Sequence, residues 1–443
     1  MRSWIGSLLI AAAALPASAE GLSLREAAAI ALEQNPQARI ARASIDAAAA
    51  RRMVSRAAWL PRVEVSQAWT RSDNPVFVFG SLLEQGRFGA EHFDADFLND
   101  PGMHRNVRLG VSARYAVFDQ FRRWDATREA QIEVEQADAA SEEVRQRLRR
   151  DVIASFYAVA VADARREVAA AATAAAEADV AAIRGRFEQG LIVESDLLAA
   201  EVQRAEFRQQ EIDAAGDAAI TRASFNALLG KSVVEPLTID SSIPEIAGNP
   251  VDLERALTLG AERRADLKSA SGAAAAAALR LRTARGSFLP RLDAFASWNG
   301  SGESFADRNS DRAYGFVVTL DLFDGAKSAR VAEARSGVES ARASEDEARN
   351  GVAMEIVAAF HRADGARRRV EVAAAAVRQA EAAARIVRDR YRQGLTTITE
   401  QLHAETALVR ARLDLLAARY DAIVGDAELQ RATGGLTDVE NLG

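Results

Sequence analysis

Residues 186–191 read RFEQGL, and residues 390–395 read RYRQGL. The two segments are 204 residues apart, and each lies between two helical patterns. A glycine in such a place predicts a left-handed residue at which the chain reverses. The pair therefore indicates two helical hairpins of the same design in one chain.

The chain repeats itself over most of its length. Through the first predicted strand the copies are offset by 229 residues, and farther along by 205 and then 204 residues. The fall from 229 to 205 places 24 extra residues between Thr70 and Val107 of the first copy. The matched pairs are 24–30 with 253–259, 60–63 with 289–292, Trp69 with Trp298, Gly110 with Gly315, Phe118-Asp119 with Phe323-Asp324, Phe156 with Phe360, and Gly230 with Gly434.

Each copy is predicted to run helix, strand, loop, strand, very long helix, turn, helix. The strands show alternating apolar and polar residues. Strands of about ten residues with one apolar face suit the wall of a membrane barrel, and an ordinary half-buried hairpin alternates in the same way. The predicted strands are about 61–70, 107–118, 290–298 and 313–323.

The helices favour an elongated architecture. Residues 121–188 contain no proline, and neither do residues 325–392. At about 1.5 Å per residue each helix would be roughly 100 Å long, far beyond a globular helix. The shorter helices add up in pairs to nearly that length, which predicts a cylinder wall in which each long helix lies beside two short ones. The shorter helices are predicted over about 24–59, 193–229, 253–288 and 397–433.

Prolines and aspartates mark the junctions between helices and strands. Pro61 and Pro290 end the first helix of each copy, because proline cannot continue a helix and disfavours it in the preceding residue. Asp119 and Asp324 stand where an N-cap would satisfy the first free N–H groups of the long helices.

The chain divides into a leader, two repeats and a linker. Residues 1–19 have the charged start, apolar run and small-residue cleavage site of a signal peptide. The first repeat is expected over 20–230, a linker in the equatorial region over 231–250, and the second repeat over 251–443.

Composition limits how the chain can meet a membrane. After residue 19 no stretch approaches the roughly 18–20 apolar residues of a membrane helix, so only a closed β-barrel could enter the bilayer. Four strands cannot enclose a lumen, since small closed barrels need about eight. The chain must therefore oligomerise if its strands enter the membrane, and three copies would supply twelve strands.

Other function classes lack support. The net charge of −7 argues against nucleic acid as a partner. The chain has no cysteine, and its four histidines (His92, His104, His361 and His403) lack metal-ligand spacing. No catalytic set can be argued, so we expect neither an enzyme nor a cofactor or metal.

Taken together, these features resemble the TolC-like outer-membrane factor (outer membrane efflux protein) family over essentially the whole mature chain. The resemblance implies a mainly α-helical homotrimer, with a twelve-stranded outer-membrane β-barrel continuous with a periplasmic α-helical barrel roughly 100 Å long. The residues that carry it are 22–27, Asn35-Pro36, the two Leu-Pro junctions, the Phe-Asp junctions and the two hairpin turns.

The family's activity and partners follow as expectations. The chain would be the exit duct of a tripartite efflux pump or a type I secretion system, passing small molecules or proteins across the cell outer membrane. Its partners would be a periplasmic adaptor (membrane fusion) protein, an inner-membrane transporter of the RND, ABC or MFS type, and outer-membrane lipid. A periplasmic coiled-coil adaptor or a structural protein stays open as the alternative.

The resemblance places a gate at the periplasmic tips. Asp196 and Glu400 lie six residues past the turn glycines, and Glu400 falls where the family's acidic ring begins. Tyr391 matches an aromatic that bonds to the acid at Asp196, and His403 stands where the family has a second acid. A ring of carboxylates in a narrow neck attracts cations, and a histidine there adds sensitivity near about pH 6–7. Alternatively, the charged residues are solvated first-turn side chains.

The turns themselves offer a docking surface. Gly190 and Gly394 reverse the chain, and Leu191 and Leu395 follow them. These leucines are either exposed contacts for adaptor tips or packing residues inside the turn.

The long first loop, 71–106, contains NPVFVFG at 74–80. Several family members carry a similar segment in the extracellular loop. Two roles stay open for it: closing the pore mouth or padding the rim.

Overall fold

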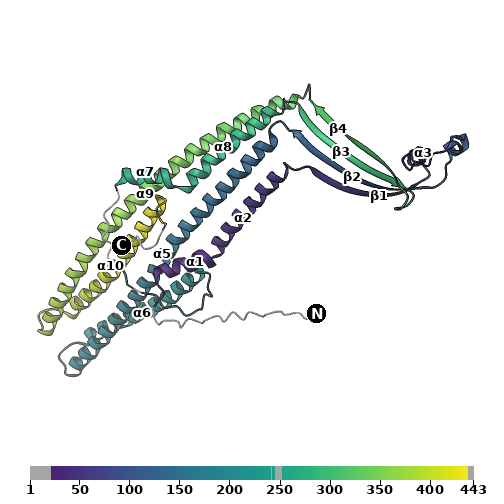
Figure 1. The fold of residues 1–443 in the computed structure, drawn as a ribbon. Helices are drawn as coiled ribbons and strands as arrows, with labels where there is room; N and C mark the ends of the chain where they lie inside the picture. Colours follow the sequence, from purple (N-terminus) through teal and green to yellow (C-terminus); the bar gives the residue numbers. More distant parts are fainter. Residues whose placement is uncertain (1–20, 241, 245–251, 438–443) are drawn as a thin grey trace, which may run out of the picture. The chain divides into compact units, whose positions relative to one another are not determined.

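The computed structural model describes residues 21–240, 242–244 and 252–437. The expected signal peptide at 1–19 lies outside these residues, as does part of the expected linker at 231–250. Helices dominate the described chain and four strands form one small sheet (Figure 1), which confirms the mainly α-helical fold class. Among the described residues, no helix combines the length and the apolar character needed to cross a membrane.

The elements follow the same order in both copies. The first copy contains α1 (Leu24–Gln34), α2 (Pro36–Ala57), β1 (Arg62–Ser72), β2 (His104–Phe118), α5 (Arg122–Glu188) and α6 (Glu194–Leu228). The second contains α7 (Leu253–Arg263), α8 (Ala265–Gly286), β3 (Arg291–Gly302), β4 (Asn309–Thr319), α9 (Gly325–Arg392) and α10 (Ile398–Ala432). The extra residues of the first copy form α3 (Pro75–Glu84), the 3₁₀ helix η1 (Ala90–Phe93) and α4 (Ala95–Asn99).

The single helices predicted over 24–59 and 253–288 are wrong, because each is divided in two. In the first copy Pro36 has no N–H to donate, and Asn35 takes an extended conformation with φ −61° and ψ 132°. In the second copy the helix is interrupted at the equivalent residue, Arg264, which lies 229 residues later and has φ −61° and ψ 124°. No proline follows it. Instead its guanidinium lies 2.7 Å from Glu355, a contact that accompanies the break.

Two compact units divide the described chain. Unit 1 comprises residues up to 40, 142–264 and from 351 onward, and unit 2 comprises 41–141 and 265–350. Each unit contains residues of both sequence repeats. The long helices α5 and α9 each contribute residues to both units.

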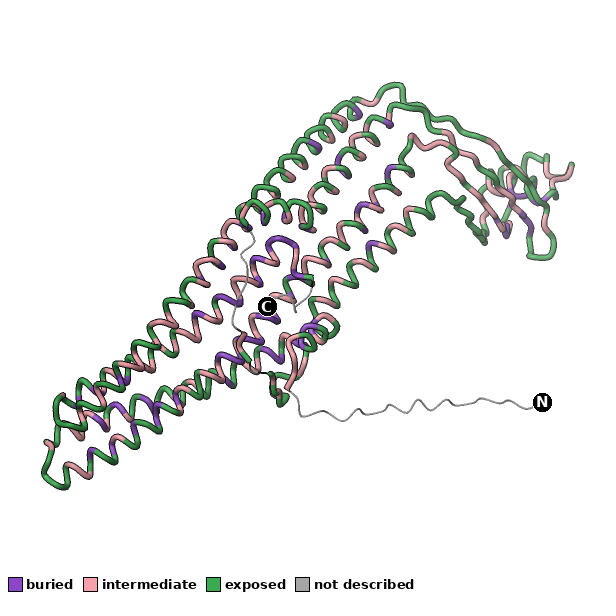
Figure 2. Tube along the Cα trace, turned by 60° about the vertical axis from the view of Figure 1, so that its left-hand side comes forward, coloured by how far each residue is buried: buried purple, intermediate pink, exposed green. Residues whose placement is uncertain are grey.

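Unit 1 is held by an apolar core from α1, α5, α6 and α10. Phe225 and Leu229 are fully buried in it, and the ring of Phe156 meets that of Phe225 edge-on at 6.0 Å. Described residues of the expected linker, including Leu237 and Ile239, pack against this core. Buried residues recur along the paired helices (Figure 2).

Unit 2 carries the antiparallel sheet in the order β1-β2-β3-β4. Its register places Ser66 opposite Gly110, and Gly110 opposite Asn299. The strand predicted over 313–323 starts earlier and ends at Thr319, which pairs with Arg291. The partner strand begins there because Pro290 cannot donate to a ladder.

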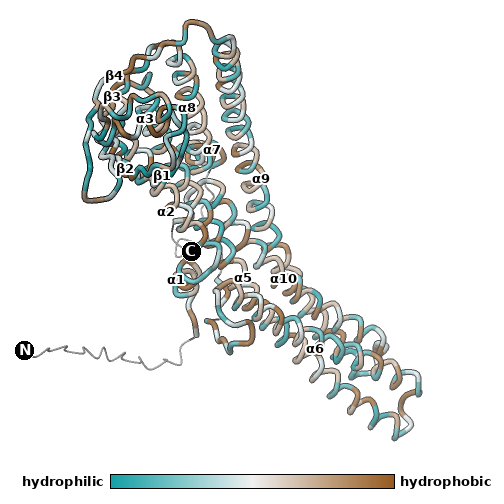
Figure 3. The backbone as a smooth tube through the Cα atoms, turned by 90° about the vertical axis from the view of Figure 1, so that its right-hand side faces the viewer, coloured by the Kyte–Doolittle hydropathy of each residue, from teal (hydrophilic) through white to brown (hydrophobic). Residues whose placement is uncertain are grey.

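The alternation of the sequence and the strand register give the sheet one apolar and one polar face. Figure 3 colours the backbone by hydropathy. The apolar face is exposed along the edge strands, where Val65 is 67% exposed, Phe316 72% and Tyr314 86%, and it is mostly half-buried along β2 and β3. Apolar side chains left exposed on both edge strands mark a surface that lipid or another protein must cover.

The junction residues lie between these elements. Pro61 and Pro290 directly precede β1 and β3. Asp324 directly precedes α9, and its carboxylate accepts the Ala326 N–H at 2.9 Å. Asp119 lies three residues before α5, and its carboxylate accepts the Arg123 N–H at 3.0 Å.

Candidate functional site

The two hairpin turns of unit 1 have the same hydrogen-bond pattern. Gly190, with φ 72°, donates to the carbonyl of Phe187 at 2.8 Å, and Leu191 donates to that of Arg186 at 3.0 Å. This pair of bonds defines a Schellman cap, which requires a left-handed residue. The second turn repeats it: Gly394 (φ 77°) donates to Tyr391 at 3.0 Å and Leu395 to Arg390 at 2.8 Å. A side chain on either glycine would have room, so backbone conformation alone explains both glycines.

A small apolar cluster joins the tips of the two hairpins. Its buried members are Val180, Ile183, Ala200 and Ile398, and Tyr391 packs against it with Ile192, Leu197 and Leu402. Leu191 and Leu395 lie outside the cluster and are 67% and 61% exposed. Their side chains therefore do not pack inside the turns.

Tyr391 lies between the hairpins. The Arg186 guanidinium stacks 5.4 Å from the centre of its ring, and its hydroxyl is buried without a hydrogen bond in the described structure. Burial raises the pKa of Tyr391, the Arg186 charge opposes the rise, and the nearby charges of Asp196 and Asp179 add to it. The hydrogen bond to Asp196 that the resemblance implies is not formed in the described structure.

The remaining expected gate residues occupy helix starts. Thr397 caps α10 by accepting the Glu400 N–H at 3.3 Å, and the Thr396 hydroxyl donates to the Glu400 carboxylate. Glu400 and His403 are exposed on α10, while Asp196 is half-buried in the first turn of α6. A hollow of about 630 Å³ at the tips has Asp196 and Tyr391 among its lining residues, but neither Glu400 nor His403.

A buried polar cluster beside the apolar one was not predicted. Glu405 of α10 is only 8% exposed, and its carboxylate lies 3.2 Å from both Arg388 of α9 and the side-chain amide of Gln401. The same amide donates to Asp179 of α5 at 3.4 Å. Burial raises the pKa of Glu405, Asp179 raises it further, and Gln401 and Arg388 oppose the rise. The cluster thus links the two hairpins through a buried carboxylate, Glu405, whose pKa is raised.

The internal repeat contains a signal for this cluster. Arg388 and Glu405 stand 204 residues after Arg184 and Glu201, which form an ion pair at 2.5 Å. Because both copies hold an arginine and a glutamate at the same spacing, a comparison of the copies would have pointed to the pair Arg388 and Glu405. Gln203, which donates to the carbonyl of Leu402 at 3.3 Å, has no such counterpart.

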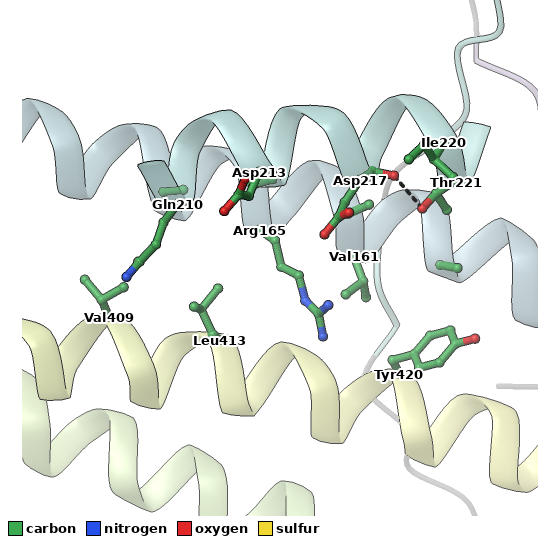
Figure 4. A pocket seen from close by; sticks show the side chains of 14 residues that line it. Val161, Arg165, Gln210, Asp213, Asp217, Ile220, Thr221, Val409, Leu413 and Tyr420 are labelled. Atoms are coloured by element: carbon green, nitrogen blue, oxygen red, sulfur yellow. Dashed lines mark hydrogen bonds between the residues drawn. The ribbon is translucent and has the colours of Figure 1, made fainter. Parts of the chain in front are cut away.

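A second hollow, of about 480 Å³, lies among α5, α6 and α10 (Figure 4). Its walls are largely alanine and aliphatic side chains, with Arg165, Asp213, Asp217 and Tyr420 among them. The Thr221 hydroxyl donates to the carbonyl of Asp217 rather than into the hollow. No group of three metal-ligating side chains occurs there or elsewhere among the residues that the structure describes.

Comparison with known proteins decides the family. The sequence matches the outer membrane efflux protein family over residues 28–231 and 257–435. The chain belongs to the outer membrane efflux protein family. It is an outer-membrane exit duct, and the resemblance seen in the sequence is confirmed.

Individual relatives agree with this membership. The chain is 26% identical to Protein CyaE of Bordetella pertussis over 432 residues, which cover 96% of this chain and 85% of CyaE. It is 24% identical to the outer membrane efflux protein BepC of Brucella suis over 269 residues, 60% of this chain and 58% of BepC.

The fold is shared with solved structures. The CmeC outer-membrane channel of Campylobacter jejuni has a TM-score of 0.81 at 15% identity, covering 94% of this chain and 88% of CmeC. The outer-membrane protein VceC of Vibrio cholerae has a TM-score of 0.77 at 20% identity, covering 93% of this chain and 96% of VceC.

Proposed function

We propose that three copies of this chain form one closed channel. The three sheets would join into a twelve-stranded outer-membrane β-barrel, and the helices would form a periplasmic tube. The observation that carries the proposal is the exposed apolar face of the sheet, together with one unpaired edge on β1 and one on β4 within the described strands. Such a face suits lipid, and such edges suit pairing with further copies.

The hairpin tips would form the periplasmic gate of this channel. In one protomer, the apolar cluster and the Glu405 cluster already hold the hairpins together. Three Glu400 carboxylates would then ring the aperture and favour cations. His403, one turn farther along α10, would lie close to this ring.

The exposed leucines would serve the partners. Leu191 and Leu395 extend from the Schellman turns into solvent, and small apolar knobs of this kind suit a helical adaptor tip. We propose a periplasmic adaptor as the protein that docks there and an inner-membrane transporter as the source of the exported molecule. A purely structural coiled coil is disfavoured, because it has no use for an exposed apolar sheet face.

Fractionation and mass measurement test the assembly. The protein is expected in the outer membrane, extracted by detergent as a trimer whose N-terminus begins after residue 19. A water-soluble periplasmic monomer would overturn the channel and favour the structural alternative.

A further inference from the structure

The segment between β1 and β2 is a folded element rather than an open loop. Its helix α3 is apolar on two opposite sides. The side toward the protein buries Val78, Ser81 and Leu82. The other side leaves Val76 82% exposed, Leu83 50% and Phe79 37%. A helix that is apolar all round is expected to be covered on both sides.

Helix α3 lies over the polar face of the sheet. The Arg108 side chain donates to Ser301 across the β2–β3 register at 3.3 Å and pairs with the carboxylate of Glu84 at the end of α3. Asn309 of β4 donates to the backbone carbonyl of Glu84 at 3.0 Å. Ser301, 1% exposed, is covered as a result.

Ring contacts keep the rest of the segment folded. The rings of Phe79 and Phe88 are 4.8 Å apart, those of Phe88 and His92 5.4 Å, and those of His92 and Phe97 4.9 Å. The chain of rings ends on His104, the first residue of β2, at 5.9 Å from Phe97. The segment is therefore anchored to the sheet from both of its ends.

The polar face of a membrane barrel lines its lumen. If the sheets form the proposed barrel, α3 lies inside it, at the strand ends opposite the helix junctions. That end is extracellular when the helices are periplasmic. The exposed side of α3 would then stand in the water of the lumen, where apolar surface is unfavourable.

We infer that the exposed stripes of α3, formed by Val76, Phe79 and Leu83, pack against one another in the trimer and close the outer mouth. This inference rests on the proposed trimeric channel. The occupant is a second copy of the chain, because α3 contacts β3 and β4, and β4 carries a free edge that the next copy must join. The channel thus has an outer constriction in addition to the periplasmic tips.

Cysteine cross-linking tests the contact, since the chain has no cysteine of its own. Val76→Cys and Leu83→Cys trimers, oxidised in intact outer membranes, are expected to give disulfide-linked dimers beside unlinked monomer, because three single cysteines can form only one bond. Glu91→Cys is the control: its side chain is 74% exposed but lies outside the stripe, and it should not cross-link.

Conductance supplies an independent readout. The double variant Val76→Ser and Leu83→Ser is expected to assemble as a trimer whose single-channel conductance is severalfold higher than that of the wild type. An intact trimer with unchanged conductance and no stripe-specific cross-link would overturn the inference and leave the proposed channel standing. Failure of the wild-type protein to form a trimer would overturn the proposed function and the inference with it.

Discussion

The carboxylate of Asp163 accepts two hydrogen bonds from Arg222, at 2.5 and 2.7 Å, and thereby ties α5 to α6. The equivalent positions 204 residues later hold Arg367 and Asp426, which form the same ion pair with the charges exchanged. The two hairpins therefore keep the interaction while the sequence at each position changes. Position-by-position identity between the copies would miss such a pair.

This exchange predicts the outcome of a charge swap. Asp163→Arg alone places two cations together and should destabilise the first hairpin by about 1–3 kcal/mol. Adding Arg222→Asp rebuilds the arrangement of the second hairpin and should recover most of the loss. Thermal unfolding of the detergent-extracted protein measures both. A double variant no more stable than the single one would show that the pairs are not interchangeable.

Glu405 predicts a pH dependence of the tips. Burial, together with Asp179, raises its pKa above 4.5, so the folded state binds the proton more tightly than the unfolded chain does. Its contribution to stability is therefore present at low pH and is lost as the pH rises through the raised pKa. Glu405→Gln should stabilise the tips at pH 7 and flatten this part of the profile, measured by hydrogen exchange of residues 179–188 and 398–405.

The matched control is Glu201→Gln in the other hairpin. Glu201 pairs with Arg184 as Glu405 pairs with Arg388, but its side chain is 30% exposed against 10% for Glu405. Its replacement should leave the pH profile of the tips nearly unchanged. Equal effects of the two substitutions would show that burial of Glu405 is not the cause.

The turn glycines predict a contrast between two alanine substitutions. Gly394→Ala forces a side chain into a left-handed conformation and should cost about 1 kcal/mol. Gly185, inside α5, also has open space around it but lies in a helix, so Gly185→Ala should stabilise by about 0.5–1 kcal/mol. Limited proteolysis at the tips and thermal unfolding measure the loss of stability expected for Gly394→Ala and the gain expected for Gly185→Ala. Destabilisation by both would point to a packing role that the structure does not show.

The faces of the sheet predict which strand positions tolerate charge. Val65→Arg puts a cation on the apolar face and should cost about 2–4 kcal/mol if that face meets the middle of a bilayer. Ser66→Arg, one residue along on the polar face, is the control and should insert normally. Yield of folded protein in the outer membrane distinguishes them. Equal yields would argue against contact between this face and lipid.

Periodicity and repeats were sufficient for the general fold. The proline-free stretches predicted both long helices, and the alternation at 107–118 predicted a strand, because these signals are local and sustained. The division at Arg264 could not be predicted locally, since no proline marks it and its ion pair with Glu355 joins distant parts of unit 1. The folding of 73–103 into α3, η1 and α4 was missed because these helices are short and depend on contacts with the sheet.

The candidate site was only partly accessible from the sequence. The glycine turns follow from local conformation and were open to prediction, whereas the sequence left Leu191 with two alternatives, exposure or packing inside the turn. Glu405, Gln401 and Asp179 were missed because they come from separate helices, and their meeting depends on how the two hairpins pack. Whether Glu400 lines an aperture depends on other copies of the chain, so it stays a prediction.

Single-channel recording tests the central claim most directly. The protein is purified from outer membranes in detergent and added to a planar bilayer, with and without millimolar divalent cations. We predict a cation-selective conductance that these cations reduce, with weaker selectivity and weaker block for Glu400→Gln. A conductance without cation selectivity or block would show that Glu400 does not line the gate. A protein that forms no trimer and never conducts would contradict the channel itself.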